Sequence, residues 1–322
     1  MKMRTLAGAI ALVLAGVAAA PAQTFPSRPV TIVVPYPAGG PTDTLARILA
    51  DHLKGTLGQP VIVENVTGAG GSIGVARVAR AAPDGYTLSI GHWNTHVVLG
   101  ATMNLSFDVL NDFAPISLLA DSPIWLVARK DLPPKSLTEF IAWLKQNKGS
   151  AGTVGVGGAS DVNGSYFQQV TGTTFQFVPY RGSAPMNQDL AAGHIDFTLG
   201  MSAATYPLVR SGQIKAYAMM TKARWWGAPE VPTMEEAGVP GLYATFWHAL
   251  WAPKGTPKEV IARMNGALQA ALADPVVQQR FKDQGQDVPP RDRQTPEVLY
   301  EHHKAEIAKW WPIIKAANIK AE

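Results

Sequence analysis

Short β-branched runs alternate with amphipathic stretches along this chain, and the alternation restricts its fold more than any other feature. The run VTIVV at 30–34 is typical of a buried strand, and from Pro41 apolar residues recur at helical spacing until Gly55. The same order of strand, loop and helix recurs up to about residue 219, before a mainly helical C-terminal part. The pattern predicts an α/β architecture.

The first 22 residues are typical of a secretory signal peptide. Two basic residues open the chain, an apolar core follows at 6–17, and Ala20-Pro21-Ala22 fits the small-x-small cleavage pattern. The apolar core is shorter than the roughly 18 residues of a membrane span. We expect a mature protein that begins near Gln23 and diffuses freely in the periplasm, because the chain has no cysteine to carry a lipid anchor.

The composition and the missing motifs exclude several classes of function. No cysteine occurs, which excludes disulfides, cysteine nucleophiles and cysteine-ligated metals. The net charge is only +4 and the basic residues are scattered, so no nucleic-acid partner is expected. GxxxxGK[ST] and GxGxxG are absent, and His92 and His96 lack the acid of HExxH. We expect no catalytic residue, no metal and no cofactor.

Four glycine- or serine-rich loops each join a strand to a helix: PAGGPT, GAGGS, VGGAS and YRGSAP, two in each half of the chain. The first amides of a helix lack intrahelical partners, and the helix end carries about half a positive charge. Glycines let a ligand approach these amides closely. Any one loop alone is an ordinary turn. Together they predict a site where several helix N-termini surround a carboxylate or phosphate.

Longer motifs resemble those of the Bug-type periplasmic receptors of tripartite tricarboxylate transporters. PYPAGGPTDTLARILA resembles the first-loop signature of that family, and ENVTGAGGSIGVARVARAAPDGYTL resembles its second block. VPYRGSAPMNQDLAAGHIDF and LWAPKGTPKEVIARMN follow in the family's order. The resemblance implies a two-lobed, type II-like clamshell in which the chain crosses twice between lobes. Lobe 1 would combine 23–121 with 249–322, and lobe 2 would be 122–248.

The resemblance also implies a function. Such a receptor is expected to capture a small carboxylate, either a dicarboxylate or an aromatic acid, and to deliver it as a monomer to membrane permease subunits. Two alternatives stay open. One is an exported hydrolase or isomerase on a similar scaffold, although no obvious nucleophile–base pair is present. The other is a partner that brings a ligand to a receptor kinase.

Position by position, the resemblance assigns a set of ligand-binding residues. They are Tyr36, Ala38, Gly39, Thr42, Asp43, Gly71, Ser72, Trp93, Thr95 and His96 in lobe 1, and Gly158, Ala159, Ser160, Asp161, Tyr180 and Gly182 in lobe 2. Several have a structural alternative: Asp43 and Ser72 also suit a helix start, and Trp93 also suits packing between elements.

Two positions depart from the family's pattern. Asp161 stands where the family commonly has histidine, and it would either accept hydrogen bonds from the ligand or favour the helix dipole as a first-turn acid. Gly200 stands where the family often has aspartate, which weakens the prediction of an amino-acid ligand. The two departures point in opposite directions on whether the ligand carries an amino group.

Overall fold

The computed structural model describes residues 25–154 and 157–320. The signal peptide predicted at 1–22 lies outside these ranges. No helix within them is long and apolar enough to span a bilayer.

A mixed sheet of nine strands organises the described part of the chain, in the order β2-β1-β3-β9-β4-β7-β5-β6, with β8 paired to β4. The pairs β1–β2, β1–β3, β5–β6 and β5–β7 are parallel, so helices must connect them, as the alternation predicts. The strands are β1 (Val30–Val34), β2 (Val61–Asn65), β3 (Thr87–His92), β4 (Phe113–Arg129), β5 (Gly149–Val154), β6 (Phe175–Tyr180), β7 (Phe197–Met201), β8 (Ile214–Met219) and β9 (Thr245–Pro253).

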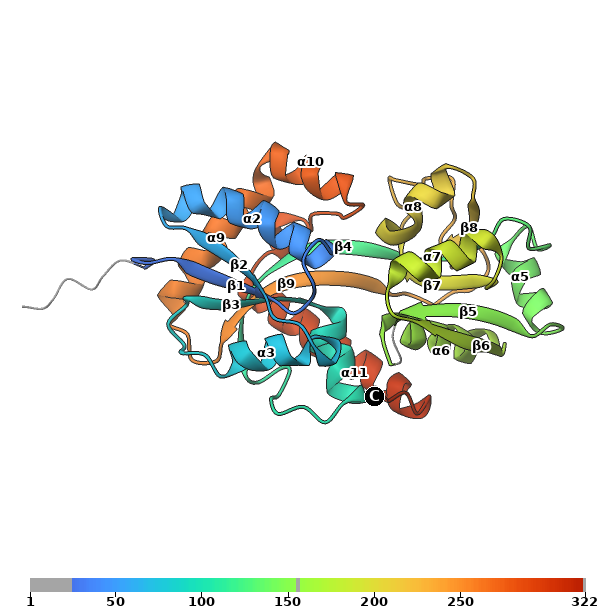
Figure 1. Cartoon of the computed structure of the whole chain (residues 1–322), viewed down its shortest axis with the longest axis horizontal. Coiled ribbons are helices and arrows are strands. Elements are labelled where there is room, and N and C mark those ends of the chain that lie inside the picture. Colours follow the sequence, from blue (N-terminus) through green and yellow to red (C-terminus); the bar gives the residue numbers. More distant parts are fainter. Residues whose placement is uncertain (1–24, 155–156, 321–322) are drawn as a thin grey trace, which may run out of the picture.

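Two long strands run between two groups of elements (Figure 1). β4 pairs with β9 from Phe113↔Pro253 to Pro123↔Thr245, and its remaining residues pair with β7 and β8. The predicted crossings at 122–125 and 245–248 fall inside β4 and β9, so they are strands rather than loops. The lobe boundaries after 121 and 248 stay a prediction.

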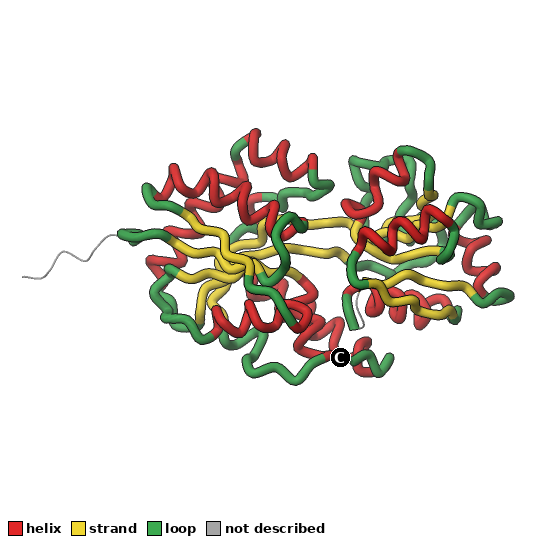
Figure 2. Tube along the Cα trace, viewed as in Figure 1, coloured by secondary structure: helices red, strands yellow, loops and turns green. Residues whose placement is uncertain are grey.

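Helices lie on both sides of the strands in each group (Figure 2). They are α2 (Pro41–Leu57), α3 (Ser72–Ala79), α4 (Leu99–Thr102), α5 (Leu137–Leu144), α6 (Ala159–Thr171), α7 (Ser183–Ala192), α8 (Ser202–Arg210), α9 (Lys258–Ala273), α10 (Pro275–Asp283) and α11 (Pro296–Ala316). Three short turns complete the set: η1 (Ala69–Gly71), η2 (Asn94–Val98) and η3 (Arg291–Arg293).

The helix predicted from Pro41 is α2, and its apolar face is buried as the periodicity indicates. The predicted end before Gly55 is wrong, because α2 continues to Leu57. Gly58 ends it in a left-handed conformation with φ 70°, and its N–H donates to the Lys54 carbonyl at 3.1 Å. Gly55 therefore lies inside the helix.

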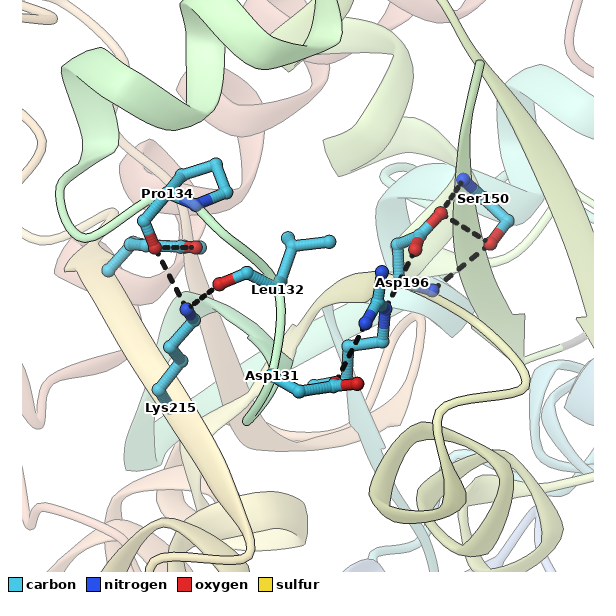
Figure 3. Close-up of polar contacts among 8 residues, drawn as sticks. Asp131, Leu132, Pro134, Ser150, Asp196 and Lys215 are labelled. Atoms are coloured by element: carbon cyan, nitrogen blue, oxygen red, sulfur yellow. Dashed lines mark hydrogen bonds and ion pairs between the residues drawn. The ribbon is translucent and has the colours of Figure 1, made fainter. Parts of the chain in front are cut away.

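Polar contacts fasten the strands of the second group to one another (Figure 3). Asp196, just before β7, accepts hydrogen bonds from Arg129 Nε of β4 at 2.9 Å and from the Ser150 amide of β5 at 2.8 Å. Lys215 of β8 donates to the Pro134 carbonyl at 2.8 Å. Asp196 thus joins β4 to β5 at the start of β7, and Lys215 fastens β8 to the loop after β4.

Gly74 marks a close approach between α3 and the loops beside it. A Cβ at this position would lie 2.5 Å from the Val66 carbonyl oxygen and 3.0 Å from Pro35 Cα, and both are backbone atoms. We expect Gly74→Ala to lower the free energy of unfolding by about 1–3 kcal/mol, measured in urea. The control is Gly55→Ala. A Cβ at this position would meet nothing within 4 Å, so the substitution should stabilise the helix by about 0.5–1 kcal/mol. Equal stability of the two variants would contradict the close approach.

Candidate functional site

A cavity of about 500 Å³ opens between the two groups of elements. Tyr36, His92 and Leu99 line it from segments that precede β4, whereas Ser160 and Thr205 line it from segments that follow. Ile124 of β4 and Phe246 of β9 add the wall at the crossing strands. Because both groups contribute, a bound molecule would contact both.

Three helices begin at this cavity. Gly158 and Ala159 at the start of α6, Ser183 at the start of α7 and Met201 at the start of α8 all line it. None of the three N-cap residues makes a side-chain cap hydrogen bond. Backbone amides at a helix start are therefore left to a ligand or to water, which suits an anion.

The cavity wall is electrically neutral. Among the described residues, no Asp, Glu, Lys or Arg lines it. The rings of Tyr36 and His92 stack there with centroids 4.7 Å apart. Burial, reinforced by neighbouring histidines, lowers the pKa of His92 well below 6.5, and burial raises the pKa of the Tyr36 hydroxyl. Both rings are therefore neutral at pH 7.

Sequence comparison assigns this architecture to a family. The model of the "Tripartite tricarboxylate transporter family receptor" matches residues 45–319. The chain belongs to the tripartite tricarboxylate transporter receptor family. The resemblance of the sequence motifs to that family is thereby confirmed.

Individual relatives agree over most of the chain. A UPF0065 protein in the TAR-I ttuE-ttuC' intergenic region of Agrobacterium vitis is 40% identical over 298 residues, which are 92% of this chain and 86% of that protein. MatC from Rhodopseudomonas palustris with bound malate is 38% identical with a TM-score of 0.80, over 90% of this chain and 100% of MatC. The periplasmic binding protein BugD is 38% identical with a TM-score of 0.80, over 92% and 100%.

These likenesses confirm the predicted two-lobed α/β fold of a periplasmic binding protein. Membership of this receptor family also makes the chain a solute-binding protein and not an enzyme. The alternative of an exported hydrolase or isomerase is wrong.

Of the residues predicted around the first glycine-rich loop, one lines the cavity. Tyr36 lines it, whereas Ala38 and Gly39 are exposed outside it. Thr42 is buried, with its hydroxyl 3.2 Å from His248 Nε2. Asp43 is 2% exposed and accepts a hydrogen bond from the Gly39 amide at 2.9 Å. Neither of these last two side chains lines the cavity; both fasten the loop to residues around it.

The residues predicted after β3 lie in the core instead of the cavity. Trp93 is fully buried against Trp310, with ring centroids 4.9 Å apart. His96 stacks on Trp251 at 3.7 Å, and the Thr95 hydroxyl bonds to the backbone of the same segment. The π-helical turn η2 begins directly after β3, and Asn94 at its start lines the cavity together with His92 at the end of the strand.

Neither residue predicted at the start of α3 lines the cavity. Gly71 is buried with φ 103°, and a Cβ there would lie 2.9 Å from Thr95 Cγ2. Ser72 borders a separate surface hollow. The cavity is reached instead by Ala69 and Gly70, one turn earlier.

The residues predicted for lobe 2 fall into two sets in the structure. Gly158, Ala159 and Ser160 line the cavity. Asp161 points back into its own loop and accepts a hydrogen bond from the Gly157 amide at 2.6 Å, while burial raises the pKa of its carboxyl. This geometry matches the first-turn acid, which is the structural alternative for that position.

The remaining two lobe 2 residues stand beside α7. The Tyr180 hydroxyl donates to Asp189 at 2.7 Å. Gly182 is the N-cap of α7, and Ser183 after it lines the cavity. Neither Tyr180 nor Gly182 itself lines it.

Sequence reasoning missed side chains that lie one turn inside the helices. Asn163 in α6 and Thr205 in α8 both line the cavity. Asn163 follows the predicted Ser160 by three residues, so helical spacing was the available signal for it. Apolar lining residues such as Met186 and Phe246 carry no motif of their own.

Proposed function

We propose that this receptor binds a small carboxylate in the periplasm and delivers it to the permease of a tripartite transporter. The observation that carries the proposal is the neutral cavity at which α6, α7 and α8 begin without side-chain caps. Each helix start contributes roughly 0.3–2 kcal/mol to the binding of an anion. The absence of a cationic side chain from the described wall suits a carrier that must release its cargo.

Two further parts of the proposal concern export and closure. Residues 1–22 would direct export and be removed, leaving a mature chain from about Gln23. Lobe 1 (23–121 with 249–322) and lobe 2 (122–248) would then close around the acid, because only the closed form contacts it from both sides. MatC binds malate, and this supports a small carboxylate as the cargo.

A thermal-shift screen tests the cargo. The purified receptor is heated with malate, succinate, adipate, benzoate or 4-hydroxybenzoate, with the matching methyl esters or amides as controls. A carboxylate present at 100 times its dissociation constant should stabilise the fold by about 2.7 kcal/mol and raise the melting temperature. Stabilisation by esters and acids alike, or by none of the acids, would contradict an anion site.

The neutral wall also predicts how affinity depends on pH. Because the pKa of His92 is lowered, its imidazole is already neutral throughout the neutral range, and the Tyr36 hydroxyl keeps its proton. We expect the affinity for a fully ionised acid to stay constant between about pH 6 and 9. Calorimetry in buffers of different ionisation enthalpy should give the same binding enthalpy. A tenfold change in affinity across this range would require a titrating group at the site.

A further inference from the structure

The side chain of Thr205 lines the cavity, and a hydrogen bond from Trp125 fixes the orientation of its hydroxyl group. Its oxygen accepts a hydrogen bond from the indole Nε1 of Trp125 at 2.7 Å, and both residues are buried. An indole N–H can only donate, so the hydroxyl oxygen has to act as the acceptor. The hydroxyl hydrogen donates to no group within the described ranges, and the side chain lines the cavity. Trp125 thus prepares Thr205 to donate to a bound molecule.

Ser160 repeats this arrangement on another helix that begins at the cavity, α6. Its hydroxyl accepts a hydrogen bond from the Val154 amide at 2.8 Å, which again leaves its hydrogen for another acceptor. The residue is 8% exposed and lines the cavity at the start of α6. Two oriented donors therefore face the cavity from α6 and α8.

Asn163 is a buried polar residue of this wall with an unpartnered side-chain oxygen. It is 1% exposed, lines the cavity and follows Ser160 by one helical turn. Its Oδ1 has no hydrogen-bond partner in the part of the chain that the structure describes. Buried polar groups without partners are rare, and each weakens the fold unless a ligand or water completes it. An apolar side chain of the same size would fit this position with less cost to stability.

We infer that Asn163, Thr205 and Ser160 form a polar subsite that holds a carboxylate group of the cargo by side-chain hydrogen bonds, an inference that rests on the proposed function. The two hydroxyls and the Nδ2 group of Asn163 donate to the carboxylate, whereas Asn163 Oδ1, which can only accept, is left to a hydroxyl hydrogen of the cargo or to water. Trp125 is a positioning residue, because it acts only through Thr205. The subsite adds side-chain selectivity to the backbone amides at the helix starts.

The subsite is tested with the acid of the screen that binds the parent receptor most tightly. Thr205→Val keeps the shape and removes the hydroxyl, so affinity should fall at least tenfold, whereas Thr205→Ser should stay within about threefold. Trp125→Phe should lower affinity by a smaller factor than Thr205→Val, because the hydroxyl remains but is no longer oriented. A Thr205→Val variant that binds as tightly as the parent would overturn the role of Thr205.

The variant Asn163→Leu adds a second measurement, the melting temperature of the ligand-free protein, which distinguishes a ligand-binding residue from a purely structural one. Affinity should fall at least tenfold while the melting temperature of the ligand-free protein stays equal or rises, because an unpartnered amide is removed. The control is Ser202→Ala in α8, a fully buried hydroxyl that has no partner in the described chain and does not line the cavity. This control should bind like the parent.

The outcomes separate the two levels of the argument. If the parent receptor binds none of the acids, the proposed function and the subsite both fail. If the parent binds an acid and Asn163→Leu binds it equally well but melts earlier, Asn163 is a structural residue and only the subsite is overturned.

Discussion

Gly200→Asp should lower the affinity of the receptor for a carboxylate about 100-fold. Gly200 lines the cavity, and a Cβ there would meet only the Thr198 hydroxyl, at an ordinary 3.8 Å, so a side chain fits. Two negative charges roughly 6 Å apart repel by about 3 kcal/mol at an effective dielectric constant of 20. That energy corresponds to about two orders of magnitude in the dissociation constant, which calorimetry resolves.

Gly200→Asn is the matched control, because it has the same size without the charge and should bind within a few-fold of the parent. The aspartate variant should also regain affinity as the pH falls and the new carboxyl takes up a proton. If the aspartate and asparagine variants bind the acid equally well, the carboxylate does not occupy this part of the cavity.

Asp43→Ala should be the most destabilising single change in the first loop. The carboxylate is 2% exposed and accepts hydrogen bonds from the Gly39 amide, from Arg47 Nε and from Asn65 Nδ2, each at 2.9 Å. Arg47 Nη2 donates to it as well, at 3.0 Å, so removing it takes the acceptor from four donors. Because the Arg47 side chain is 52% exposed and can be hydrated, we expect a loss of about 1–3 kcal/mol in the free energy of unfolding, measured in urea.

The same carboxylate gives the receptor a defined acid sensitivity. Burial alone would raise the pKa of Asp43, but its hydrogen bonds to Arg47, Gly39 and Asn65 outweigh burial and lower the pKa from 3.8 to about 2. A lowered folded-state pKa stabilises the fold above pH 3.8, here by about 2 kcal/mol, and this stabilisation is lost as the pH falls toward 2.

The parent receptor should therefore lose more stability than Asp43→Ala between about pH 4 and 2. Asp51→Ala serves as the control, because the Asp51 side chain is 72% exposed and its ion pair with Arg280 is 3.3 Å long. Such a surface pair contributes about 0–1 kcal/mol. Parallel pH profiles for the parent and Asp43→Ala would contradict the role assigned to this carboxylate.

The backbone groups that line the cavity could be predicted from the sequence, whereas most of the side chains that line it could not. Glycines and serines between a strand and a helix indicate where the helix begins, so Gly158, Ala159 and Ser160 could be predicted to lie beside the cavity. Asn163 and Thr205 lie inside helices, where a polar residue has no local signal that separates a ligand contact from an ordinary surface position. Their role depends on which helix face meets the opposite lobe, and that is decided by long-range packing.

The segment after β3 shows the same limit in another form. The family resemblance assigned Trp93, Thr95 and His96 together to the ligand site. Because η2 coils immediately, Thr95 and His96 are buried while Asn94 between Trp93 and Thr95 lines the cavity. The local coil geometry, which motif matching does not contain, selects among adjacent residues.

The connection between the two proposed lobes is a pair of hydrogen-bonded strands instead of two separate loops. β4 and β9 stay paired through Asp121↔Trp247, Ser122↔Phe246 and Pro123↔Thr245, so closing the lobes has to twist a hydrogen-bonded ribbon. In the closure proposed above, part of the binding free energy of the carboxylate would be used to twist this ribbon, and the observed affinity would be lower by that amount.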